Sequence, residues 1–436
     1  HSDGFVQMNE EDIDMDLRFN AMENTFKNFL SMIPGIYQNH FEDLKAEGTM
    51  GLKGSMVGKM TDNHLPKTDI QLKVNNGSFN YPDFPRNVKD VFIDLSYANS
   101  NGMPDNSILN VSKLKANIGG DLVDGRLLFK TPINNPYVDA ELKGDIDLSH
   151  IKGFIPLEEG TVLEGVIGLN TQVKGYIEAS DNYYQDLDAK GFLKASDIRF
   201  ISPSDPTGIV LKTVDISISP SYATIENAQG NLGRNDFELN GRVENYLAYL
   251  FIGETLKGNL DLKSRYLNAN DFMSENEAHN TDPLPSDSNT ISMVVLPENI
   301  DWKMSADVQK LIYDNFVLEN VKGNLHVVDA AIKFENVAAS LAGGAILLDG
   351  VYDSKNIQSP FTELNTSLTN FDIKKSFEYF PFMRKFSNLG KVANGVFDGK
   401  IEMNSTLDEG MQPQYNSMNM NADLSISDAV ITNLDV

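Results

Sequence analysis

Apolar and polar residues alternate along much of the chain, which is the pattern of a β-strand with two chemically different faces. Residues 300–308 (IDWKMSADV) place five apolar side chains on one face and Asp, Lys and Ser on the other. Residues 44–53 and 397–403 have the same pattern. Each of these segments is therefore predicted to be a strand with one apolar and one polar face.

The predicted strands belong to a large repeated unit. Four times, an alternating strand that ends in Leu leads into a short helical segment with aromatic residues, at 26–34, 151–156, 271–273 and 371–381. Three of these segments stop at Pro, because Pro cannot continue a helix. About five more strands follow each segment. The repeats predict four domains, at residues 11–131, 136–245, 254–353 with an inserted loop at 274–290, and 360–436, which holds only part of the unit.

The helical segments carry apolar residues at helical spacing. Phe26, Phe29, Leu30 and Ile33 share one face in the first segment. Ile373, Phe377 and Phe380 do so in the fourth. We expect these stripes to pack against the sheet.

Short turns of Gly, Asn and Asp join neighbouring strands, for example at 119–121, 233–236 and 342–344. Links of this length form hairpins, so neighbouring strands should be antiparallel. About 20 strands spaced at ~4.8 Å give a sheet on the order of 100 Å wide, which cannot stay flat. We predict an all-β fold: an elongated, curved, mostly antiparallel sheet of repeated meanders that forms an open groove, with short helical segments between the repeats. A closed sandwich or barrel is the alternative, but a large unit that repeats favours the open sheet.

Charge and composition narrow the function. The chain has 436 residues, with 62 acidic and 36 basic ones, for a formal net charge of −26. Such a surface repels phosphate backbones, so nucleic acid is not an expected partner. There is no Cys, and the six His residues have no metal-ligand spacing. No nucleotide-binding loop or nucleophile motif is present, so we expect no enzyme activity, no catalytic residue, no metal and no cofactor.

Several motifs resemble a known family. Residues 223–233 (ATIENAQGNLG) with 237–241 (FELNG), and 332–344 (IKFENVAASLAGG) with 347–350 (LLDG), look like the strand pairs of AsmA-like and TamB-like proteins. Residues 393–400 (ANGVFDGK) resemble the C-terminal region of that family. The resemblance implies a Gram-negative envelope protein in the periplasm, anchored in the inner membrane by an N-terminal helix outside the given residues. It also implies a repeating β-groove of the lipid-transfer type.

The sequence therefore favours a periplasmic conduit that carries phospholipid between the inner and outer membranes and maintains the outer membrane. Its partners would be phospholipid or another acyl-chain lipid, and the membranes at its two ends. A non-enzymatic β-repeat adhesin or carbohydrate-binding surface protein is the alternative. A β-helix enzyme fits less well, because its coils are much shorter than the repeat found here. We expect these residues to line the groove: Leu44, Met50, Leu52, Ile70, Leu72, Leu256, Leu260, Leu262, Trp302, Met304, Val308, Phe397, Ile401 and Met403.

Overall fold

The fold was obtained as a computed structural model. The structure describes residues 2–9, 12–25, 45–80, 87–152, 157–177, 187–272, 296–341, 343–379, 393–408 and 411–431. The chain divides into two compact units. Unit 1 comprises His1–Ala228 and Glu244–Glu254, and unit 2 comprises Gln229–Val243 and Thr255–Val436.

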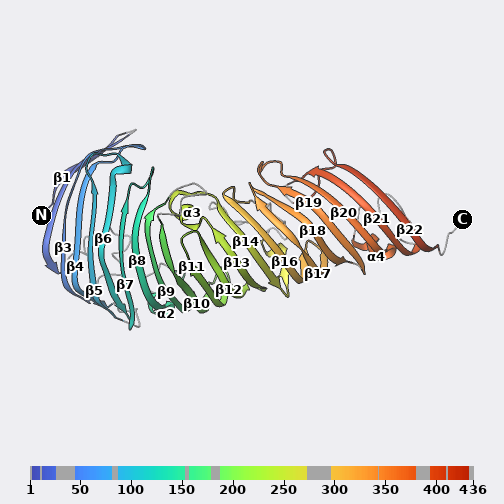
Figure 1. Cartoon of the computed structure of the whole chain (residues 1–436), viewed down its shortest axis with the longest axis horizontal. Helices are drawn as coiled ribbons and strands as arrows, with labels where there is room; N and C mark the ends of the chain where they lie inside the picture. The colour runs from blue at the N-terminus through green and yellow to red at the C-terminus, as the bar shows by residue number, and fades with distance from the viewer. Residues whose placement is uncertain are drawn as a thin grey trace. The chain divides into compact units, whose positions relative to one another are not determined.

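Unit 1 is a meander in which each strand pairs antiparallel with the next one along the chain (Figure 1). The alternating sequence gives each strand its two faces, and short turns make consecutive strands neighbours. The strands are β1 (Ser2–Met8), β2 (Ile13–Thr25), β3 (Lys45–Met60), β4 (Lys67–Asn80), β5 (Val88–Asn99), β6 (Ser107–Ile118), β7 (Asp121–Lys130), β8 (Tyr137–Asp147), β9 (Val162–Tyr176), β10 (Asp188–Ile201) and β11 (Ile209–Ile218).

β12 (Tyr222–Leu232) and β13 (Asn235–Glu244) follow β11 in the chain. Unit 2 then begins its own run with one irregularity, because β14 and the short β15 pair parallel with β16. All later neighbours are antiparallel. These strands are β14 (Leu256–Ser264), β15 (Leu267–Asn268), β16 (Ile300–Tyr313), β17 (Phe316–Val328), β18 (Ala331–Leu341), β19 (Gly344–Asp353), β20 (Phe361–Asp372), β21 (Ala393–Thr406) and β22 (Asn419–Ile431).

All 22 strands are assigned to one sheet. In the described ranges, the registers give β1 a single partner, β2, and give β22 a single partner, β21. The sheet is therefore open rather than closed on itself. The predicted all-β class, with an open and mostly antiparallel sheet and few helices, is confirmed.

The helical segments are short. Those in the described residues are η2 (Pro104–Asn106), α2 (Leu148–Ile151), α3 (Tyr246–Ile252), η5 (Ala269–Phe272) and α4 (Ile373–Tyr379). α2, η5 and α4 lie at or next to three of the predicted segments. The fourth, at 26–34, lies outside the described residues, as do 153–156, 273, 380–381 and the predicted loop at 274–290. The alternation did not predict α3.

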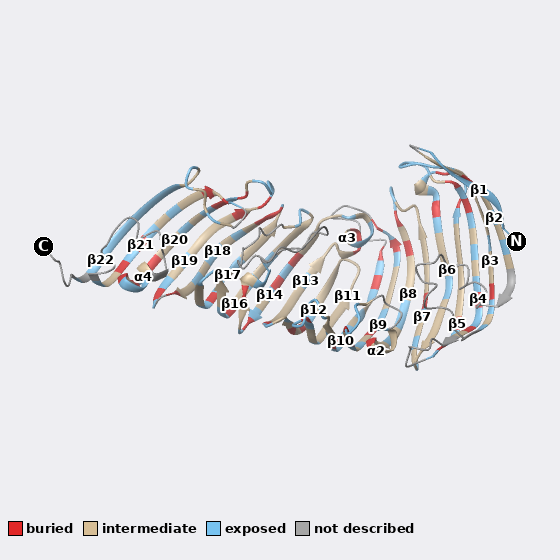
Figure 2. Cartoon of the chain, turned by 180° about the vertical axis from the view of Figure 1, so that it is seen from behind, coloured by how far each residue is buried: buried red, intermediate tan, exposed pale blue. Residues whose placement is uncertain are grey.

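In the described part of the chain, buried residues form several small clusters rather than one large core. Figure 2 shows them as short stretches on individual strands, among residues of intermediate exposure. Three clusters form where a helical segment packs on the sheet: α3 in unit 1, the segment at Leu148 in unit 1, and α4 in unit 2. A fourth, around Met50 and Val74, is made by strand residues alone. In the α4 cluster, Ile373 and Phe377 pack against the sheet as their spacing predicts.

Candidate functional site

The register of unit 1 places apolar side chains of successive strands on one face. A row of directly paired residues crosses seven strands, from β3 to β9. A second row continues on the same face across β9, β10 and β11. We call this surface the unit 1 apolar face; the first row is Leu52, Leu72, Leu95, Val111, Leu127, Ala140 and Val173, and the second is Leu169, Leu193 and Ile216.

Unit 2 has a corresponding surface, the unit 2 apolar face. A row of directly paired residues crosses eight strands, from β14 to β22. Gly350 is the one position in this row that has no side chain. The row is Leu260, Met304, Leu325, Phe334, Gly350, Leu364, Met403 and Met420.

The opposite face of each unit is polar and carries ion pairs between neighbouring strands. Lys73 lies 3.5 Å from Asp94 in unit 1, and Lys322 lies 2.9 Å from Asp307 in unit 2. These side chains are largely exposed, so each pair adds little stability. Burial opposes ionisation of Asp139, but hydrogen bonds from Arg126 and Lys174 outweigh it and lower the pKa of that carboxyl. The polar faces keep the sheet hydrated on one side.

The middle of each apolar face is only partly covered. Its residues are mostly half-buried, shielded from the side by neighbouring strands. Every described strand belongs to the one sheet, so within the described residues no second sheet packs on these faces. Exposure rises at the last strand, where Met420 is 45%, Leu424 52% and Ile426 55% exposed. Apolar surface of this extent is unusual in a protein without a ligand or partner.

Helical segments cover the apolar faces near the strand ends. In unit 1, Leu247 and Ala248 of α3 are buried against Val138 and Ala189, and Phe251 lies 5.5 Å from Phe129 between ring centroids. At the opposite strand ends, Leu148 packs with Leu163, Ala195 and Ile198. In unit 2, α4 packs over the fully buried Phe371. Three residues of the first row in unit 1, Leu127, Ala140 and Val173, pack against the same cluster as Leu247 and Ala248, and Ile401 in unit 2 packs against the cluster that contains Ile373 of α4.

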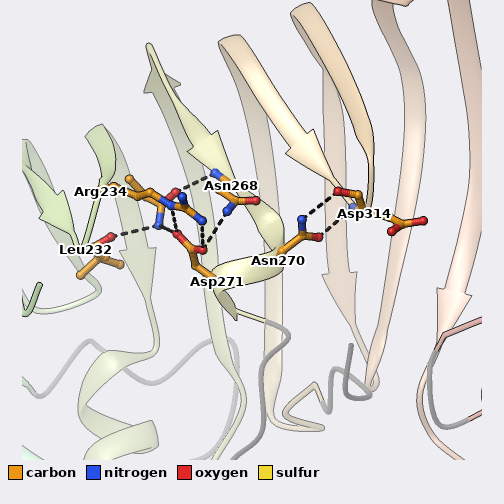
Figure 3. A network of polar contacts seen from close by, with 7 residues as sticks. Leu232, Arg234, Asn268, Asn270, Asp271 and Asp314 are labelled. Atoms are coloured by element: carbon orange, nitrogen blue, oxygen red, sulfur yellow. Dashed lines mark hydrogen bonds and ion pairs between the residues drawn. The ribbon is translucent and has the colours of Figure 1, made fainter. Parts of the chain in front are cut away.

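A polar network fixes the turn that precedes the parallel crossover in unit 2 (Figure 3). The Asp271 carboxylate in η5 accepts hydrogen bonds from Arg234 at 2.7 and 2.5 Å, from Asn235 at 3.0 Å and from Asn268 at 2.8 Å. These bonds, led by those from Arg234, lower the pKa of Asp271. Asn270 in turn bonds the backbone of Asp314 at the β16–β17 turn. The network thus holds β15 next to β16.

The residues predicted to line a groove all share these faces, apart from Leu44, which lies outside the described residues. Met50, Leu52, Ile70 and Leu72 lie on the unit 1 apolar face. The residues of β14, β16 and β21 lie on the unit 2 apolar face: Leu256, Leu260, Leu262, Trp302, Met304, Val308, Phe397, Ile401 and Met403. Met50, Leu260, Val308 and Phe397 are buried, so the other nine offer more surface to a ligand.

Sequence reasoning left out several residues of the two rows. Leu95 and Val111 in unit 1, and Leu325, Phe334 and Leu364 in unit 2, occupy the same face as the predicted ones. These residues can be identified from the register between paired strands. Once two strands are paired by their turn, every second residue of the new strand joins the face.

Other features of the described residues are less suited to a functional site. An open depression of about 650 Å³ lies on unit 2 and is lined mainly by polar-face side chains such as Asp261, Ser305 and Lys322. No group of His, Asp and Glu among the described residues could hold a metal ion. No helix in the described ranges has the length and apolar character to cross a membrane.

Comparison of the chain with protein-family models, curated proteins and solved structures gives no match.

Proposed function

We propose that the two apolar faces bind acyl chains, and that the chain is a lipid-binding conduit. The observation that supports this most directly is the row of paired apolar residues that crosses eight strands in unit 2 and, apart from the buried Leu260, keeps part of its surface exposed. At ~4.8 Å per strand such a row is about 34 Å long, roughly twice the hydrocarbon depth of one membrane leaflet. It can therefore accommodate acyl chains laid across the strands.

The free energy of apolar contact favours movement of a lipid along the row, not a reaction at one point. Each methylene removed from water contributes about 0.8 kcal/mol, whichever apolar side chain it contacts. A chain can therefore slide along the row from one strand to the next with little change in free energy. Polar headgroups would remain in water at the open side of the sheet, so affinity should follow acyl length more than headgroup or salt.

The resemblance to AsmA-like proteins supports placing this activity in the periplasm. There the conduit would carry phospholipid between the inner and outer membranes and maintain the outer membrane. The polar faces, with their Asp and Lys pairs, suit an aqueous compartment between two lipid phases.

The test adds a charge to the apolar row. Ile401 is half-buried on β21 and pairs with Thr366, so Ile401→Asp puts a carboxylate on the unit 2 apolar face. An unpaired ion there is costly to desolvate, and we expect loss of lipid from the purified protein. The control is Ser367→Asp, which adds the same charge on the polar face beside Lys400. Lipid is measured by mass spectrometry after purification without detergent from a Gram-negative host, with folding checked by circular dichroism.

A photo-crosslinker in place of Met304 gives an independent readout of bound lipid. Met304 lies on the row of the unit 2 apolar face, two strands from Phe334, where an acyl chain is proposed to bind. The protein that carries this crosslinker and no other change should crosslink to lipid. If it carries no lipid and never crosslinks to one, the conduit proposal fails and a β-repeat binding protein becomes the better interpretation.

A further inference from the structure

One edge of unit 1 gathers five connecting segments. Strands β3, β5, β7 and β11 end at this edge, and β4, β6, β8 and β12 begin there, so their links lie side by side. The helix α3 joins them, since its Tyr246 hydroxyl donates to the Ser219 carbonyl at 3.0 Å. We call this edge the loop rim; it consists of residues 61–66, 100–106, 131–136, 219–221 and 246–252.

Hydrogen bonds between the links fix the loop rim. Leu65 donates its backbone N–H to the Gly102 carbonyl at 2.8 Å. The Asp105 carboxylate accepts from the backbone N–H groups of Ile133 and Asn134, both at 3.0 Å, and from the Asn134 side chain at 2.7 Å. These bonds, led by the backbone bond from Asn134, lower the pKa of Asp105. The loops are thus preorganised rather than loosely placed.

The fixed loops hold large apolar side chains outward. Met103 is 61%, Ile133 59% and Leu250 69% exposed, and Phe251 is 40% exposed. Met103 and Ile133 come from the two loops that Asp105 joins. Loops usually carry polar residues at such tips, so a cluster of exposed apolar tips on neighbouring loops indicates an interaction surface.

The loop rim is also nearly free of charge. Its residues include two carboxylates, Asp62 and Asp105, in a chain with a net charge of −26. The β1–β2 link at the same edge adds Asp12, which is paired with Lys59 at 2.9 Å. Asp105 is engaged by the bonds described above. The opposite edge of unit 1 is acidic by comparison, with Glu158, Glu159 and Asp205 in its described links. Residues 10–11 of the link between β1 and β2, and residues 178–186 of the link between β9 and β10, lie outside the described residues, so their charges do not enter this comparison.

We propose that the loop rim docks on a phospholipid bilayer, with Met103, Ile133 and Leu250 inserted into its interfacial region. Separate apolar tips on a neutral rim suit the mixed headgroup and acyl layer, whereas an acidic rim would be repelled by anionic lipid. Tyr246, with its ring at the rim and its hydroxyl hydrogen-bonded, has the amphipathic character that favours this layer. This docking rests on the proposed function, because it would bring the unit 1 apolar face to the membrane from which it takes lipid.

The test is flotation of the full chain with vesicles of pure phosphatidylcholine, and with vesicles that also contain phosphatidylglycerol. Both should bind the unmodified protein, because insertion is mainly apolar. The double variant Met103→Asp and Ile133→Asp should lower the bound fraction about tenfold. The matched control is Leu122→Asp and Ile209→Asp, which changes two exposed apolar residues at the opposite edge and should leave binding intact. Absence of binding by the unmodified protein, or equal loss in both double variants, overturns the proposal.

A second measurement does not depend on how the Asp variants fold. Ile133→Trp adds an indole at the rim to a chain whose only other Trp is Trp302. On adding vesicles, its emission should shift to shorter wavelength and be quenched by brominated phosphatidylcholine. Unquenched emission contradicts docking and points instead to a protein partner for the rim.

Lipid recovered from the rim variants separates the two proposals. The Asp substitutions at the rim leave the apolar rows unchanged, so co-purified lipid should persist while vesicle binding is lost. If the unmodified protein binds vesicles but carries no co-purified lipid, the conduit proposal is contradicted and docking of the loop rim is supported. If it carries lipid but does not bind vesicles, the conduit proposal is supported and docking of the loop rim is contradicted.

Discussion

The indole of Trp302 lies over Gly258 of the neighbouring parallel strand. A β-carbon at Gly258 would be 3.1 Å from Cδ1 and 3.4 Å from Nε1 of Trp302. The two residues are direct partners in the register of β14 and β16. The missing side chain thus makes room for the largest side chain of the unit 2 apolar face. The indole Nε1 is buried there with no hydrogen-bond partner, so the ring is held by apolar contact.

Gly258→Val should displace this ring. We expect unfolding to become easier by about 1–3 kcal/mol, the usual cost of overpacking a filled site. The fluorescence of Trp302, the only Trp in the chain, should shift to longer wavelength as the indole moves toward water. Asn259→Val is the control, because Asn259 is exposed on the polar face of the same strand. A similar shift in both variants would mean that the ring does not depend on Gly258.

The Asp271 network predicts a pH-dependent contribution to stability. The pKa of Asp271 is lowered in the folded protein, chiefly by the hydrogen bonds from Arg234. Its stabilising effect is therefore complete above the unfolded-state pKa, near 3.8, and is lost as pH falls through the lower folded-state pKa. Asp271→Asn should reduce the free energy of unfolding at pH 7 by about 1–3 kcal/mol. The difference from the unmodified protein should shrink as the pH is lowered below about 4.

Asp314→Asn is the control for that experiment. Asp314 contributes only its backbone groups to the contacts with Asn270, so the substitution removes a charge and leaves those bonds in place. Denaturant unfolding at neutral and acidic pH measures both variants. A pH-independent effect of Asp271→Asn would show that the carboxylate charge is not what stabilises the turn.

The strands and their faces could be read from the sequence because a period of two needs only local information. In β16, Trp302, Met304 and Val308 are placed on one face by alternation alone, and the register confirms that they share it. Short Gly and Asn turns then made consecutive strands antiparallel neighbours. The faces of both units follow from these two rules.

The sequence did not reveal α3 or the parallel pair. α3 (YLAYLFI) is apolar almost throughout, so it has no polar side to mark a helical period, and no side-chain hydrogen bond caps it at Asn245. Its position depends on Val138 and Ala189, which are distant in sequence. The parallel pairing of β14 with β16 requires a crossover between Asn268 and Ile300. A turn motif cannot predict such a pairing, because the partners are not joined by a hairpin.

Tyr352 should make the protein sensitive to alkali. It is 6% exposed, and burial, with smaller contributions from Tyr313 and Asp353, raises its pKa to about 12. Between the ordinary value of 10.0 and about 12 the unfolded chain ionises this group while the folded protein keeps it neutral, so stability falls as pH rises. Tyr352→Phe should flatten that fall in urea titrations at increasing pH. Tyr415→Phe, at a residue 71% exposed, should not, and equal slopes in both variants would contradict the assignment.

The helix α3 should be held in place by two side chains. Its seven residues are too few for a helix to persist alone in water, so its stability must come from packing. Leu247 is 5% and Ala248 2% exposed against the unit 1 apolar face, whereas Leu250 on the same helix is 69% exposed. Gly253 closes the helix in the left-handed region, with φ of 72°, and donates its N–H to the last turn.

Leu247→Ala should therefore release α3, because truncating a buried Leu typically costs about 2–5 kcal/mol, more than an isolated turn of helix can offset. Hydrogen exchange followed by mass spectrometry should show rapid exchange of the α3 amides, while those of β8 remain protected by their strand partners. Leu250→Ala is the matched control on the same helix and should leave α3 protection unchanged in the absence of membranes. Because α3 covers Val138 and Ala189, its release should also expose more of the apolar face, and Leu247→Ala should bind more of a fluorescent fatty acid than Leu250→Ala does. If α3 stays protected in Leu247→Ala, this contact does not hold the helix on the sheet.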